Sequence, residues 1–297
     1  MLDSYLKDLD KVYNEKIYPD LKKAEQIRKK ILLNYTIIGT VLFSGMLVEA
    51  ITWMSVAIFI IILFVLVYTR WYGIPVSKYE KSYIHAITAN IIEFINPGLK
   101  VDHSSHLKLS ELKDAHIITG QPEYFAGKNL IYGNINGREI RISEITATSK
   151  YKKENGIEHT YEYFNGIVIV ADDKPDITGN LMICSSNELL KYYLPIIQNI
   201  KLENIEQEEL TVFSDDDIAA KKYATPQLLN TLREYHLHTD NNVMYSVSET
   251  GFALAILHNR KFTYLDPSVF STAYNKKVVE MYYRDLRFLI GTMTEAK

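Results

Sequence analysis

The sequence is poor in cysteine, in catalytic motifs and in excess charge of either sign. Its 297 residues include one cysteine, Cys184, which rules out an intrachain disulfide and a cysteine-ligated metal cluster. No Walker loop, dinucleotide-binding glycine pattern or HExxH motif is present. The net charge of -3 lacks the basic excess of a nucleic-acid-binding surface. We therefore expect no nucleic-acid partner and no cofactor.

One long stretch also lacks charge. Between Ile31 and Trp71 the only charged residues are Glu49, near the middle, and Arg70, at the end. A helix crosses a bilayer core with about 20 residues, so this stretch is long enough to cross twice. A carboxylate at the centre of a span costs on the order of 2.5–3.5 kcal/mol, whereas one in a turn at the surface costs little. The sequence predicts a transmembrane helical hairpin over residues 31–72, with spans at 31–48 and 53–72 and a turn at Glu49–Thr52. The alternative is a hairpin buried on all sides by protein.

Basic residues set the expected orientation of this hairpin. They flank it on both sides and are missing from its turn: Lys22, Lys23, Arg28, Lys29 and Lys30 precede it, and Arg70, Lys78 and Lys81 accompany or follow it. Positive charge stays on the cytoplasmic side of a membrane. The first thirty residues lack the short apolar core of a signal peptide. We expect both termini to be cytoplasmic.

The pattern divides the chain into three parts. Residues 1–30 are a charged, amphipathic helical segment that Pro19 interrupts, where a second helical piece begins. This segment either packs on the folded domain or lies on the lipid surface, or else mediates oligomerisation. Residues 31–72 are the hairpin, and residues 73–297 are a cytoplasmic domain.

Residues 73–297 alternate between helical and strand patterns. Three β-hairpins are expected, with turns at Asn136-Gly137, Glu154-Asn155-Gly156 and Glu249-Thr250-Gly251. Gly166–Ala171 is expected as a buried strand, with Gly179–Cys184 as a possible neighbouring strand. Glu209–Phe213 is expected as a short strand. Helices are expected from Val76 to the breaker Asn96-Pro97-Gly98, at Asn187–Ile200, from Thr225-Pro226 to about Tyr235, and at Tyr274–Thr294. Strands in meanders with flanking helices predict an α+β fold with a mainly antiparallel sheet.

Three groups of residues could carry chemistry. Asp215, Asp216 and Asp217 could bind a cation or act as acid and base, although carboxylates also cap helix N-termini. His236 and His238 would share a face if their stretch were extended, with His258 approaching from a hairpin to complete a metal site. Ser143-Glu144 lacks the glycine elbow of a serine nucleophile. We interpret Cys184 as a small core residue.

Three segments resemble a bacterial membrane-protein family known only as a domain of unknown function, whose members are sometimes labelled galanin. They are Ile140–Glu144, Phe164–Asp172 and Val212–Leu229, the last of which includes Tyr223. The resemblance implies a charged N-terminal helix, a two-helix transmembrane hairpin and a cytoplasmic domain in the bacterial inner membrane. Ala224 departs from the family, which has a larger aliphatic there, and Asp173 departs where an aromatic is usual. The family implies no activity, so it provides no catalytic residue.

The leading hypothesis is therefore a membrane-anchored cytoplasmic binding or scaffold module. Its partners would be the lipid bilayer and proteins, including copies of itself. The 22 tyrosines favour a binding module, because tyrosine is large, rigid and half polar. Candidate binding residues are Asp215, Asp216, Asp217, Tyr223, Ser143 and Glu144. The alternative is a membrane-associated, metal-dependent enzyme that uses Asp215–Asp217 or His236 and His238.

Overall fold

The computed structural model describes residues 8–49, 74–118, 120–152, 158–175, 179–185, 203–207, 209–215, 221–258 and 265–295. The chain divides into two compact units. Unit 1 comprises Met1–Phe94 and Tyr264–Arg284, and unit 2 comprises Ile95–Thr263 and Asp285–Lys297.

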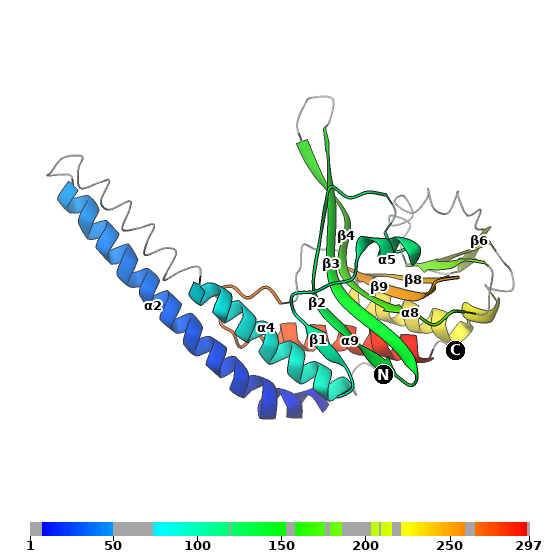
Figure 1. Ribbon diagram of the computed structural model, residues 1–297, viewed down its shortest axis with the longest axis horizontal. Helices are drawn as coiled ribbons and strands as arrows, with labels where there is room; N and C mark the ends of the chain where they lie inside the picture. The colour runs from blue at the N-terminus through cyan, green and yellow to red at the C-terminus, as the bar shows by residue number, and fades with distance from the viewer. Residues whose placement is uncertain are drawn as a thin grey trace. The chain divides into compact units, whose positions relative to one another are not determined.

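Unit 1 is helical. A π-helix, η1 (Tyr13–Ile17), leads into α2 (Tyr18–Glu49), and α4 (Ile74–Ile95) comes later in the chain (Figure 1). Helix runs without a break through residues 8–49, and only its type changes, from π-helix to α-helix between Ile17 and Tyr18. Pro19 follows that change, so the interruption predicted there was wrong. The predicted helix that stops before Asn96-Pro97-Gly98 is confirmed as α4.

The surface of α2 changes character at Ile31. Up to that residue the helix has one buried face, which includes Leu21, Ala24 and Ile31. From residue 32 to residue 40 no side chain is buried, and Leu33 and Ile37 are 60% and 47% exposed. Within the described ranges, no helix is both long and apolar enough to cross a membrane. The predicted second span, 53–72, lies outside the described residues.

Unit 2 is built on one antiparallel sheet. Its described strands lie in the order β1-β2-β3-β4-β9-β8-β5-β7-β6, and each neighbouring pair is antiparallel. The strands are β1 (Lys100–Asp102), β2 (Tyr124–Ile135), β3 (Arg138–Lys152), β4 (Glu158–Ala171), β5 (Leu181–Cys184), β6 (Glu203–Gln207), β7 (Leu210–Ser214), β8 (Asn242–Ser248) and β9 (Gly251–Leu257). Among these described strands, the β4–β9 pairing alone connects the first four to the other five. The α+β fold with an antiparallel sheet is confirmed.

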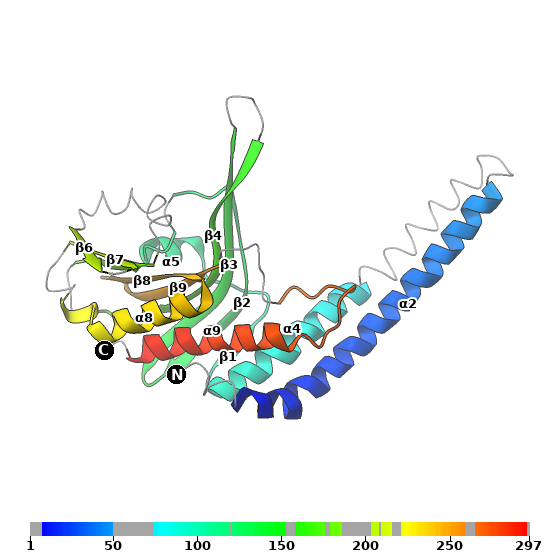
Figure 2. The same cartoon turned by 180° about the vertical axis from the view of Figure 1, so that it is seen from behind.

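Helices cover both faces of this sheet. Helix α5 (Leu109–Asp114) lies on one face, and α8 (Pro226–Thr239) lies on the other together with the unit 2 portion of α9 (Lys276–Glu295), as comparison of Figures 1 and 2 shows. On the α5 side, Leu112 belongs to a buried core with Ile145 and Val168. On the opposite side, the ring of Tyr235 in α8 stacks on Phe288 in α9, with centroids 3.8 Å apart.

Local turn and cap signals account for most of the predicted elements. Asn136 and Gly137 both have positive φ, which is the conformation that a two-residue hairpin turn requires. Thr225 caps α8 by accepting a hydrogen bond from the Leu228 N–H at 3.2 Å, with Pro226 as the first helical residue. The hairpin of β8 and β9 and the C-terminal helix are also confirmed.

Long-range pairing was predicted less well. β5, which contains Cys184, pairs with β7 and β8 rather than beside Gly166–Ala171, so that predicted neighbour was wrong. β6 had no recognisable pattern and was missed. The predicted helix at Asn187–Ile200 and the turn at Glu154-Asn155-Gly156 fall outside the residues described.

Candidate functional site

A polar cluster lies in unit 2 where β2 bulges against β3. The register steps from Lys128 opposite Glu144 to Ile131 opposite Ile142, so Asn129 and one neighbour share a single partner residue. Asn129 has a φ of 56°, a left-handed conformation that asparagine adopts more readily than most residues. Bulges redirect side chains, and this one directs the Asn129 amide at β3. We call Glu144, Asn129, Lys128 and His103 the bulge cluster.

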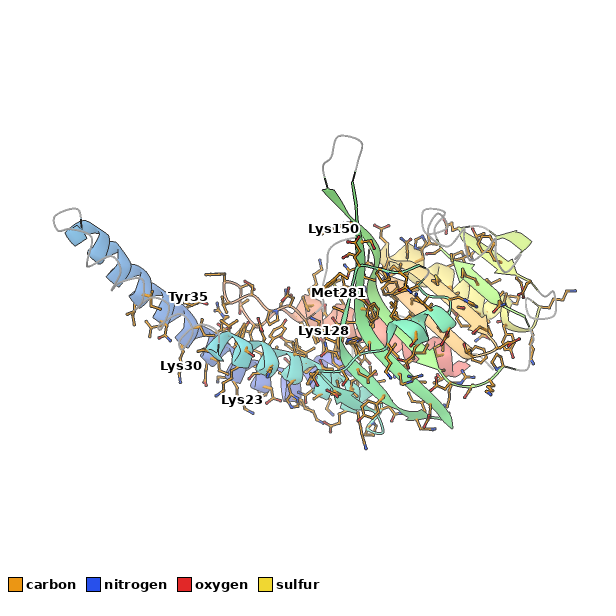
Figure 3. All side chains as sticks on the ribbon, turned by 45° about the horizontal axis from the view of Figure 1, so that its top comes forward. Lys23, Lys30, Tyr35, Lys128, Lys150 and Met281 are labelled. Carbon is orange, nitrogen blue, oxygen red and sulfur yellow. The ribbon has the colours of Figure 1, made fainter. Side chains whose placement is uncertain are left out.

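The members of the bulge cluster form a chain of polar contacts. The Asn129 Nδ2 group donates to Glu144 Oε1 at 2.8 Å. Asn129 Oδ1 lies 2.9 Å from His103 Nδ1, and because this oxygen can only accept, the histidine proton belongs on Nδ1. The Lys128 Nζ atom lies 3.8 Å from Glu144 Oε2 and is partly exposed (Figure 3). Lysine therefore connects a buried carboxyl group to the surface.

Ser143 lies on the other face of β3 and serves as an acceptor. Its hydroxyl oxygen receives the backbone N–H of Leu107 at 3.1 Å, and the side chain is fully buried. Gly127 makes the adjacent packing possible, because a Cβ there would lie 2.6 Å from the Cβ of His106. Ser143 therefore fixes the loop that follows β1 and is not placed as a nucleophile.

Glu144 has an unusual protonation equilibrium. Burial raises the pKa of its carboxyl group, while the charge of Lys128 and the hydrogen bond from Asn129 oppose that rise. A carboxyl group in this setting can hold a proton to higher pH than an exposed one. The bulge cluster therefore holds a buried carboxyl group whose protonation depends on the charge of a partly exposed lysine.

Replacing Glu144 with glutamine tests this property. The raised pKa means that the folded state binds the proton more tightly than the unfolded state, so stability is full below the ordinary glutamate pKa and falls as pH rises through the raised value. Each unit of upward shift costs about 1.4 kcal/mol at high pH. In urea unfolding across a pH series, Glu144→Gln should abolish this decline. Glu139→Gln, an exposed position on the same strand, should keep it. An identical pH profile for the wild type and Glu144→Gln would contradict the interpretation.

Asp215, the first residue of the acidic cluster, makes a structural contact between two strand ends. The Asp215 carboxylate accepts hydrogen bonds from the backbone N–H and the side-chain amide of Asn180, the latter at 2.8 Å. Asn180 in turn contacts the His116 ring at 3.1 Å. The contact therefore connects Asp215, the residue after β7, to Asn180, the residue before β5. Asp216 and Asp217 lie outside the described residues.

Tyr223 is a core residue. It is 6% exposed, and its ring packs edge-on against Phe252 of β9 with centroids 5.4 Å apart. Many other tyrosines are buried as well, and the fully buried ones are Tyr79, Tyr235, Tyr245, Tyr282 and Tyr283. Among these residues tyrosine fills the core instead of forming a binding face.

The predicted histidine site does not form. Helix α8 continues to Thr239, so His236 and His238 lie on a helix and not on the extended stretch that a shared face required. Two residues apart on a helix, their side chains diverge by about 200°. The His236 Nδ1 atom contacts the Asn241 carbonyl oxygen at 2.8 Å, and His258 follows the last residue of β9. No group of three or more potential metal ligands occurs among the described residues.

Cys184 is confirmed as a core residue. It is fully buried in the cluster that packs under α5, and burial raises the pKa of its thiol to about 12. A thiol in that state is inert as a nucleophile.

Two arginine sites escaped the sequence analysis. In unit 1, Arg28 forms a buried ion pair with Glu25, at 2.6 Å between Nη2 and Oε1. In unit 2, Arg138 binds the Asp173 carboxylate and the Met293 carbonyl, and lies over the Phe252 ring at 5.0 Å. The i,i+3 spacing of Glu25 and Arg28 was readable, but their burial was not. Arg138 had no local signal, because its partners are distant in sequence.

By the fold of its described residues, the chain is an α+β protein whose strands form one antiparallel sheet, with a helical unit beside it in the sequence. Residues 162–296 match the family model described as "Protein of unknown function (DUF3137)". The resemblance to a domain of unknown function is thereby confirmed. Two of its three segments lie within the match, and Ile140–Glu144 precedes it. No curated protein matches the chain.

One solved structure has detectable similarity, the crystal structure of the mycobacterial trehalose monomycolate transport factor A, TtfA. The identity is 14%, the match covers 67% of this chain and 93% of that one, and the TM-score is 0.34. Similarity at that level carries no argument about the function of this chain.

Proposed function

We propose that this chain is a membrane-anchored module whose cytoplasmic domain binds proteins, either partners or further copies of itself. The observation that carries the anchoring is the change in α2 at Ile31. Before it, charged side chains surround a buried face; after it, residues 32–40 are uncharged and none is buried. Apolar surface exposed to water costs about 25 cal/mol per Å², and lipid removes that cost.

The extent of the described part of α2 is compatible with the first span. The helix includes all of residues 31–48 and Glu49, the residue at which the sequence places the turn between the spans at 31–48 and 53–72. A carboxylate there would reach the far membrane surface. Of the basic residues before the first span, Arg28 is buried against Glu25, so it does not act as a free flanking charge. Lys22, Lys29 and Lys30 are exposed and remain available to hold the N-terminal side in the cytoplasm of a bacterium.

Cysteine labelling in intact cells tests the anchoring. The single native cysteine is buried and gives little background. We expect Glu49→Cys to react with a membrane-impermeant maleimide once the outer envelope is opened. Lys11→Cys, at an exposed N-terminal position, should react only after the inner membrane is permeabilised. Labelling of both sites or neither before permeabilisation, or recovery of the protein in the aqueous fraction without detergent, would refute the topology.

The binding role is supported by the edge of the sheet. β1 pairs with only three residues of β2, from Leu130 to Tyr132, so Tyr124–Lys128 pairs with β3 alone among the described strands. Tyr124 and Tyr132 are 57% and 40% exposed along this strand. An open edge with exposed aromatic side chains suits the addition of a strand from another chain.

Cysteine crosslinking can test whether this edge binds another chain. In membranes treated with a thiol crosslinker, Tyr124→Cys should give a discrete higher-mass adduct. Leu237→Cys, equally exposed but on α8, should not. Competition by excess unlabelled protein should remove the adduct if the partner is a second copy. If neither cysteine forms an adduct, the binding role fails.

A further inference from the structure

Residues 265–275 form a strap fixed to α2 within unit 1. The Arg28 Nη1 group donates to the Val269 carbonyl oxygen at 2.9 Å. The Ala273 N–H donates to Glu25 Oε2 at 3.0 Å. Val269 and Ala273 are both buried, so the strap is held at two points four residues apart. This attachment gives the residues between them a defined place.

Phe270 lies between those two points and is 77% exposed, the most exposed large hydrophobic side chain described. Its ring is 6.1 Å from the ring of Tyr35 on α2. A phenylalanine on a mobile loop could avoid water by collapsing onto the surface. The hydrogen bonds at Val269 and Ala273 fix the backbone on both sides of Phe270, so its ring projects from an anchored segment.

The part of α2 that contacts the strap is followed by the part with exposed apolar side chains. Glu25, Arg28 and Tyr35 follow helical spacing along the face that the strap contacts. Leu33 and Ile37 are also exposed on α2, but each is two residues from Tyr35 and therefore lies on the opposite side of the helix. Figure 3 shows Lys30 and Tyr35 along this part of α2, and Lys30 is exposed. An exposed basic residue thus precedes the proposed span, and the aromatic and aliphatic side chains follow within its first seven residues.

We propose that Phe270, whose ring lies beside that of Tyr35 near the start of the first span, inserts into the headgroup–acyl boundary of the bilayer. This inference rests on the proposed anchoring and adds a second membrane contact to it. At 1.5 Å per residue, Tyr35 lies about 6 Å along the helix from Ile31. Interfacial side chains reach about 5–10 Å into that boundary, and aromatic rings are enriched there. Lys29 and Lys30, exposed one turn earlier, face the level of anionic headgroups.

A single-tryptophan reporter tests the contact. The native tryptophans, Trp53 and Trp71, are replaced by phenylalanine in the full chain, and Phe270→Trp is introduced. The protein is reconstituted into vesicles that contain anionic lipid and carry bromine either near the headgroup or deep in the acyl chain. We expect blue-shifted emission from position 270, with most of the emission lost to the shallow bromine and little to the deep one. Tyr124→Trp in the same background should show neither effect.

A matched chain that keeps Trp71 alone separates this inference from the anchoring. If Trp71 is quenched by bromolipid and the tryptophan at position 270 is not, the interfacial contact is refuted while the anchor stands. If Trp71 is not quenched, the anchor itself fails. If emission from position 270 is blue-shifted but insensitive to bromine at every depth, a protein surface covers the residue, and the lipid contact is likewise refuted.

Discussion

Replacing Gly166 with alanine is expected to separate the two halves of the unit 2 sheet. A Cβ at this position would lie 1.9 Å from the backbone carbonyl oxygen of Ile256 and 3.0 Å from its carbonyl carbon. Backbone atoms inside a ladder cannot rotate away as a side chain can. The strands would have to move apart, and we expect destabilisation of about 3 kcal/mol or more, at the upper end of the overpacking range.

The position of Gly166 makes this effect global. β4 and β9 pair from Gly166 opposite Leu257 to Ala171 opposite Phe252, and this ladder alone connects β1–β4 to the remaining described strands. Gly251 lies at the other end of this ladder. A Cβ at Gly251 would clash with the Ala171 carbonyl oxygen, and the φ of Gly251 is 146°. Both ends of the ladder therefore require glycine.

Hydrogen-exchange mass spectrometry of full-length protein in mild detergent would measure the loss. Peptides from β4 and β9 should lose protection in Gly166→Ala, along with the rest of unit 2. Gly291→Ala is the matched control, because nothing lies within 4 Å of a Cβ on that helical residue. Alanine there should be neutral or stabilising by up to about 1 kcal/mol. Wild-type protection of β4 in Gly166→Ala would contradict the close-packed ladder.

These cases indicate what the sequence can and cannot disclose. Asn136-Gly137 and Thr225-Pro226 were readable because each acts on its own neighbours, through a turn conformation or a helix cap. Gly166–Ala171 was readable as a buried strand, but Phe164-Asn165-Gly166, interpreted as its opening, lies inside β4, which begins at Glu158. The reason for its glycine was hidden, because the obstructing carbonyl comes from a strand ninety residues later. The position of β5 between β7 and β8 was hidden for the same reason.

The candidate site shows the same division. Ser143 and Glu144 were singled out by resemblance, but their roles depend on partners from outside β3. Leu107 and Asn129 supply those partners, and neither had a distinctive pattern. The histidine hypothesis failed on one local point, because α8 runs through His236 and His238 where the sequence suggested it would end near Tyr235. Because the helix is a few residues longer than predicted, the two histidine side chains point in different directions and cannot share a metal ion.

The other large effect is expected in unit 1, at the ion pair between Glu25 and Arg28. The side chains are 5% and 10% exposed, and two nitrogens of Arg28 reach the two carboxylate oxygens at 2.6 and 2.8 Å. Arg28→Met leaves a buried carboxylate without its counter-charge, and removal of one partner from such a pair costs about 3–5 kcal/mol. The double replacement Glu25→Met with Arg28→Met should recover much of that loss, because no charge then remains buried.

Lys23→Met provides the matched control on the same helix. Lys23 and Asp20 have the same i,i+3 spacing, but Lys23 is 77% exposed, so its loss should cost under about 1 kcal/mol. Thermal unfolding of the full-length protein in detergent would rank the four chains. Equal losses for Arg28→Met and Lys23→Met would mean that the buried pair contributes no more than a surface pair.

The pH dependence of this pair has the opposite sign to that of Glu144. The hydrogen bonds from Arg28 hold the pKa of Glu25 below its usual range, and the Ala273 N–H adds to that effect. Its stabilisation is therefore present above the ordinary glutamate pKa and is lost as pH falls through the lowered value. Glu25→Gln should lose stability at neutral pH and converge with the wild type in acid, whereas Glu144→Gln differs most from the wild type at high pH.

Since Glu25 and Arg28 also hold the strap, acid or Arg28→Met should release Phe270 and weaken bromolipid quenching of a tryptophan at that position while leaving Trp71 quenched. Retention of the quenching at position 270 after the strap is released would show that Phe270 reaches the lipid without this support.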